Sequence, residues 1–106
     1  MSETTLPLET AAEATDLDDS DVHRLLADRQ RRTVVTVLRD STAVTRSELA
    51  TAVADRERGD GDATTERVET RLHHVHLPVL DEAGVVNYDP EAELVEPLPS
   101  LQTLRR

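Results

Sequence analysis

Three closely spaced histidines are the first residues of this sequence whose types and spacing suggest chemistry. His73, His74 and His76 form the pattern His-His-x-His. On a helix, His73 and His76 lie one turn apart and Glu69 precedes His73 by one turn, so a three-ligand metal site is one interpretation. The interpretation that we favour places His76 in the core and the other two histidines on the surface. The sequence therefore predicts neither a bound metal nor a cofactor.

Arginine supplies every cationic side chain that could bind an anion. The chain has 12 basic residues, all of them Arg, against 22 Asp and Glu, which gives a net charge of −10. Arg67 and Arg71 lie one helical turn apart, and each guanidinium can donate two parallel hydrogen bonds to a guanine or a phosphate. The alternative is that they form surface pairs with Glu66, Glu69 or Asp62, worth at most about 1 kcal/mol each.

The composition argues against other functional classes. Because the chain contains no Cys, disulfides and thiolate nucleophiles are excluded. There is no glycine-rich phosphate loop and no serine-histidine nucleophile motif, so we expect no enzymatic activity. No apolar run approaches the ~20 residues of a membrane span, and no signal-peptide core follows Met1. We therefore expect a cytoplasmic protein that does not contact a membrane.

Capping residues and apolar spacing predict the helices that position these side chains. Ser20 is expected to cap a first helix over about 20–28, and Asp28 to cap a second one. The β-branched run after Asp28 would also suit a strand, but its apolar residues are spaced as on a helix. Thr45 and Glu48 form a capping box for a third helix over about 46–57.

A fourth helix is expected to begin after Thr64 or Thr65 and to end at Gly84. Its predicted buried stripe consists of Val68, Leu72, Val75 and Val79. That stripe places Arg67, Thr70 and His74 on the solvent side, with Arg71 on the flank. In a second register, Leu77 and Leu80 are buried instead, and a kink at Pro78 would reconcile the two. The sequence leaves this choice open.

The pattern becomes extended after Gly84. Residues 85–88 and 94–95 flank the turn Asp89-Pro90-Glu91, which predicts a β-hairpin. We expect a mainly α fold with a small C-terminal β-hairpin over 18–96, after a disordered acidic tail over 1–17. Residues 97–106 are expected to form a C-terminal tail whose leucines pack on the domain or on a second subunit.

Two segments resemble winged helix-turn-helix domains. The segment 76–86, HLPVLDEAGVV, looks like the end of a recognition helix entering its wing, and 25–32, LLADRQRR, looks like the start of such a domain. The Lys-free composition, rich in Asp, Glu, Thr and Val, resembles that of proteins from salt-loving archaea. Together these features are similar to a haloarchaeal family of winged helix-turn-helix domains of unknown function. The resemblance implies a transcriptional regulator and supplies no ligand or operator.

A helix-turn-helix lays its second helix in the major groove and its first across the DNA backbone. These helices would be about 65–77 and 46–57 here, in a protein that binds double-stranded DNA as a homodimer. The residues expected to contact DNA are Arg67, Thr70, Arg71 and His74 on the second helix, and Arg46 and Ser47 at the start of the first. For Arg46 and Ser47, a merely solvated helix start is the alternative.

The charge of the predicted wing argues in part against DNA binding. Asp89, Glu91 and Glu93 surround its tip, so we expect the wing to stay out of a DNA groove. The alternative function is a protein–protein interaction module on a winged-helix scaffold that does not bind DNA. Its docking surface would be Leu77 or the C-terminal leucines Leu98, Leu101 and Leu104.

Overall fold

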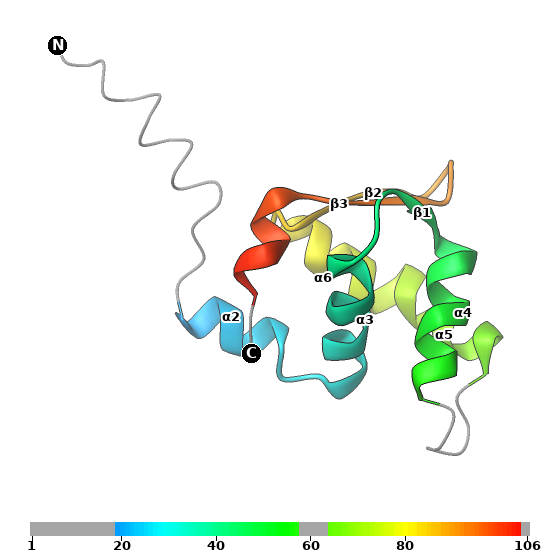
Figure 1. Cartoon of the computed structure of the whole chain (residues 1–106), viewed down its shortest axis with the longest axis horizontal. Coiled ribbons are helices and arrows are strands. Elements are labelled where there is room, and N and C mark those ends of the chain that lie inside the picture. Colours follow the sequence, from blue (N-terminus) through cyan, green and yellow to red (C-terminus); the bar gives the residue numbers. More distant parts are fainter. Residues whose placement is uncertain (1–18, 58–63, 105–106) are drawn as a thin grey trace, which may run out of the picture.

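The computed structural model describes residues 19–57 and 64–104, in which helices lie along one side of a small sheet (Figure 1). The acidic segment 1–17 and the loop around Gly59 and Gly61 lie outside the described residues, so the expectations for them stay predictions. The elements in chain order are α2 (Asp19–Leu25), α3 (Arg29–Arg39), β1 (Val44–Thr45), α4 (Arg46–Arg56), α5 (Thr65–Arg71), the π-helix η2 (Leu72–His76), α6 (Leu77–Glu82), β2 (Val86–Asp89), β3 (Leu94–Pro97) and the 3₁₀-helix η3 (Pro99–Thr103).

The sheet has three antiparallel strands in the order β1-β3-β2. The predicted hairpin is confirmed as β2 and β3, with Tyr88 opposite Val95. The strand β1 was not predicted; its Val44 pairs with the same Val95 from the other side. The described chain is thus mainly helical with a small antiparallel sheet near its C-terminal end, and this arrangement is compatible with a winged helix-turn-helix.

Three helices begin at the residues whose side chains cap them. Asp28 accepts a hydrogen bond from an N–H in the first turn of α3, and Thr64 does the same for α5. Thr45 and Glu48 form the predicted capping box of α4, with both of its hydrogen bonds at 3.0 Å. The helix prediction for the segment after Asp28 is therefore confirmed. Because Asp28 already starts α3, α2 ends at Leu25, earlier than predicted.

The fourth predicted helix contains a wide turn. α5 passes into η2, where the N–H of Leu77 donates to the carbonyl of Leu72, five residues earlier. A proline has no N–H to donate, and its ring clashes with the carbonyl four residues before it in a regular helix. Pro78 is the second residue of α6, just after η2, so the wide turn accommodates it. Gly84 then ends the helical segment with a φ of 80°, which glycine adopts without steric cost.

The wide turn corrects the predicted buried stripe. Val75 is 38% exposed, contrary to the first predicted register. One extra residue in the turn rotates everything after it by about 100°. The first register therefore holds through Leu72, and the second register, with Leu77 and Leu80 buried, holds after the turn. The residues of this segment that are buried in the core are Val68, Leu72, His76, Leu77 and Leu80, with Val79 partly buried.

The C-terminal segment completes the core. η3 packs against α3, and Leu101 and Leu104 are fully buried. The hydroxyl of Ser100 donates a hydrogen bond of 2.6 Å to the carbonyl of Gly84 and joins η3 to the end of α6. The docking surface suggested for a protein–protein module is therefore wrong in its main members, because Leu77, Leu101 and Leu104 are inside the chain's own core.

Candidate nucleic-acid interface

The outer side of α5 and η2 carries the four residues expected to contact DNA bases. Arg67, Thr70, Arg71 and His74 follow one another at helical spacing and are all exposed. Val68 on the opposite side is buried and fixes the orientation of the helix. The structure thus brings the four predicted side chains to one exposed face, as expected from their spacing.

Two hollows lie on this face, and Thr70 lines both. One has a volume of about 530 Å³ and is also lined by Glu66, Arg67 and Arg71. The other, of about 240 Å³, is lined by Glu66, Glu69, Thr70, His73 and His74, together with Arg46 from α4. Arg46 is therefore the predicted residue of α4 that the structure joins to the α5 face. Ser47 is exposed beside it at the start of α4 and lines neither hollow.

Arg71 is half exposed, and its guanidinium contacts side chains at the start of α3. Its Nε donates to Oε1 of Gln30 at 3.1 Å, and its Nη2 lies 3.6 Å from Oδ2 of Asp28. These contacts orient the guanidinium without covering it, since 51% of the side chain is accessible. These contacts could not be predicted from the sequence, because Gln30 and the cap Asp28 belong to α3 and not to α5.

Arg46 is enclosed, with only 14% of its side chain exposed. Its guanidinium donates to the hydroxyl of Tyr88 at 2.6 Å and to Oε2 of Glu69 at 3.2 Å, and it lies 3.4 Å from Oε2 of Glu93. The hydrogen bond to Tyr88 and the nearby carboxylates raise the pKa of Arg46, against the effect of burial. Arg46 therefore connects α4 with α5 and with the β2–β3 hairpin, which is the predicted wing. A phosphate would have to displace a carboxylate to bind Arg46.

Tyr88 and His73 belong to the same group of side chains, and the sequence did not predict the contact between them. The Tyr88 hydroxyl accepts from Arg46, which leaves its own proton to donate to Nδ1 of His73 at 2.7 Å. The proton of a neutral His73 ring then lies on Nε2. The one available signal was that Tyr88 is the only tyrosine of the chain and lies on the first strand of the hairpin.

His73 contacts Tyr88 whereas His76 contacts Gln30, which argues against a metal site shared by the two histidines. His76 is fully buried, and its Nε2 lies 2.9 Å from Oε1 of Gln30. Burial lowers the pKa of His76 from 6.5 to about 4, so the ring is neutral at neutral pH. Within residues 19–57 and 64–104, no three His, Cys, Asp or Glu side chains are grouped as a metal site.

The wing tip is acidic and locally ordered by its own side chains. The carboxylate of Asp89 accepts hydrogen bonds from the N–H groups of Glu91 and Ala92. Glu93 adopts a φ of 56°, and its backbone carbonyl accepts from the N–H of Arg46 at 2.9 Å. The wing is thus fixed to the start of α4 while Asp89 and Glu91 stay exposed.

Among the described helices, none has the length and apolar character needed to cross a membrane.

Comparison with known proteins gives a family for this chain. No curated protein matches the chain, and no solved structure does. A family model matches residues 23–96, which include α3, α4, the α5–α6 segment and most of the sheet. The chain therefore belongs to the family described as Domain of unknown function (DUF7344).

Proposed function

We propose that this protein is a non-enzymatic transcriptional regulator that binds double-stranded DNA through the outer face of α5 and η2. The observation that supports the proposal is the exposed row Arg67, Thr70, Arg71 and His74, on the second helix of a packed helix pair. In this arrangement the row lies in the major groove while α4 crosses the DNA backbone.

Each side chain of the row has a role that its chemistry allows. Arg67 and Arg71 reach guanine edges or phosphates, for which the planar guanidinium is suited. Thr70 and His74 contact base edges between the arginines, and Ser47 donates to a phosphate at the start of α4. Arg71 brings the advantage that Gln30 and Asp28 already orient it, so less conformational freedom is lost on binding.

The structure refines the role proposed for Arg46. Glu69 would repel phosphates from the edge of the interface, and Arg46 neutralises it at 3.2 Å. We assign to Arg46 the positioning of α5 and the wing, with phosphate binding left to Ser47 and the exposed arginines. The acidic wing tip stays outside the groove, because Asp89 and Glu91 would face phosphates there.

The experiment is selection of duplexes from a random pool by the purified chain, followed by affinity measurement with the Arg67→Ala/Arg71→Ala variant. Each lost guanine or phosphate contact of this type is worth about 1–3 kcal/mol, so the double variant should bind at least about tenfold more weakly. Arg24→Ala on α2 is the control, because this arginine is 72% exposed and remote in sequence from the interface. The number of chains per selected duplex tests the proposed homodimer.

Two results would overturn the proposal. One is a wild-type chain that is folded but enriches no duplex; the other is a double variant that binds as tightly as Arg24→Ala. Arg67→Ala alone keeps the test valid if the loss of the Arg71 contacts to α3 destabilises the double variant. Chromatin pulldown of the tagged protein beside the double variant then shows whether the same residues determine occupancy in its host.

A further inference from the structure

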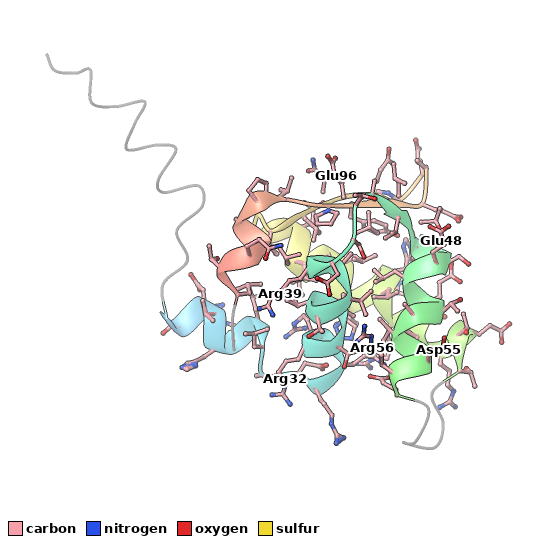
Figure 2. The ribbon with its side chains drawn as sticks, in the orientation of Figure 1. Arg32, Arg39, Glu48, Asp55, Arg56 and Glu96 are labelled. Atoms are coloured by element: carbon pink, nitrogen blue, oxygen red, sulfur yellow. The ribbon has the colours of Figure 1, made fainter. Side chains whose placement is uncertain are left out.

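A second group of arginines lies between α3 and α4, apart from the α5 face. Arg29, Arg32, Thr33 and Thr36 follow one side of α3, and Arg56 is the last residue of α4. Together they line an open hollow of about 590 Å³. Figure 2 shows Arg32 and Arg56 at the same end of this pair of helices.

The hollow is positive in a strongly acidic chain. None of the five residues that line it is acidic, although the chain has 22 Asp and Glu against 12 basic residues. Across the described ranges, neither Arg32 nor Arg56 forms an ion pair. Two acidic neighbours in sequence have other partners, since Glu57 accepts from Gln30 at 2.9 Å and Asp28 caps α3 and pairs with Arg71. Asp55, the residue before Arg56, does not line the hollow.

Arg32, Thr33 and Thr36 keep hydrogen-bond donors that a ligand can reach. One Nη of Arg32 donates to the carbonyl of Leu26 at 3.2 Å, which orients the guanidinium and leaves its other N–H groups uncommitted. The hydroxyls of Thr33 and Thr36 donate to carbonyls one turn earlier and can rotate toward an anion. The first half of α3 adds the positive end of the helix dipole.

We propose that this hollow binds a phosphate-bearing anion. Guanidinium groups from two helices can hold phosphate oxygens from different directions, so a ligand with two linked phosphates can contact both helices. The phosphate comes either from a small diphosphate compound or from a DNA backbone. The site is independent of the proposed interface, because it shares no residue with the α5 face.

The test is calorimetric titration of the full chain with inorganic pyrophosphate, at an ionic strength held constant with KCl. Arg32→Gln/Arg56→Gln should weaken pyrophosphate binding by at least about tenfold, because the variant loses the charge-assisted hydrogen bonds from both helices to the anion. Arg24→Gln removes an exposed arginine on α2, outside both proposed sites, and should change the affinity less than about twofold. Absence of saturable binding by the wild-type chain, or an equal loss in the control, overturns the proposal.

A second arm distinguishes the two sources of phosphate. If the hollow holds DNA phosphates, Arg32→Gln/Arg56→Gln also weakens binding to a selected duplex and lowers the slope of log affinity against log salt by about 2. If it holds a small compound, the variant loses pyrophosphate binding and keeps its affinity for duplex. Because the pyrophosphate titration needs no DNA, the failure of the DNA-binding proposal and the failure of this one are separate outcomes.

Discussion

At the scale of single residues, the buried histidine His76 connects the proposed interface to the core. Its Nε2 donates to Gln30 at 2.9 Å, and the same amide oxygen accepts from Arg71 on the exposed face. A charged His76 would also face Arg31 at 3.5 Å and Arg71 beyond Gln30, with Asp28 at 3.9 Å as its only described acidic neighbour. Burial and these arginines favour the neutral ring, which is the form that fits this site.

This arrangement predicts how stability depends on pH. The folded pKa of His76 is about 4, whereas the unfolded chain has the ordinary value of 6.5. Between these values the unfolded state binds more protons, so the free energy of unfolding falls as pH decreases from about 6.5 to about 4. The full loss from this group is about 3 kcal/mol, and none is added below pH 4. Urea unfolding at a series of pH values measures it.

The matched variants are His76→Gln and His74→Gln. His76→Gln should flatten the pH dependence of the free energy of unfolding between pH 4 and 6.5, whatever its effect on stability at neutral pH. The second removes an exposed histidine two residues away and should leave the slope unchanged. A wild-type slope that persists in His76→Gln would show that other groups cause the acid sensitivity.

At the scale of elements, the wide turn η2 sets which side chains the long helical segment buries. Val75 is exposed within this turn, so it is the residue whose removal returns the segment to regular helical spacing. Deleting Val75 together with Pro78→Ala keeps Val68, Leu72, Leu77 and Leu80 on one face of a continuous helix. We expect this variant to fold, with a loss of no more than about 2 kcal/mol in urea unfolding.

The control inserts one alanine after Thr70 instead, again with Pro78→Ala. Thr70 is exposed and lies in the regular part of the helix. The insertion adds a second extra residue between Val68 and Leu77, which turns Leu77 and Leu80 by a further ~100° and takes them out of the core, so this variant should not fold. Equal behaviour of the two variants would mean that η2 is not what fixes the register.

The same elements show what sequence could predict. Helix starts depend on residues three apart, such as Thr45 and Glu48, so the starts of α3, α4 and α5 were predicted correctly. The start of α2 was predicted wrongly, because Ser20, its expected cap, lies inside the helix. The strand β1 has only two residues and exists through pairing with Val95, far along the chain. The Arg46 group likewise needs Tyr88 from the hairpin and Glu69 from α5. Contacts between distant segments leave no local pattern, which is why these features and the arginine hollow were missed.

At the scale of the whole molecule, the net charge of −10 opposes the compact state. The core that resists this repulsion is made of Leu, Val and Ala side chains with one histidine. Exposed carboxylates are spread over several elements, for example Glu82 on α6, Glu91 between β2 and β3, and Glu96 on β3. Figure 2 labels Glu96 on the sheet and Glu48 on α4. Their mutual repulsion acts over distances that salt can screen.

We therefore expect salt to stabilise this chain. The Debye length shortens from about 10 Å at 0.1 M to about 3 Å at 1 M, so KCl should raise the melting temperature by at least about 5 °C over this range. The variant Glu82→Gln/Glu91→Gln/Glu96→Gln has less repulsion to screen and should show a smaller rise from a higher starting value. Calorimetry of both chains decides the cause, because an equal rise in the two would assign the effect to general salting-out of apolar surface.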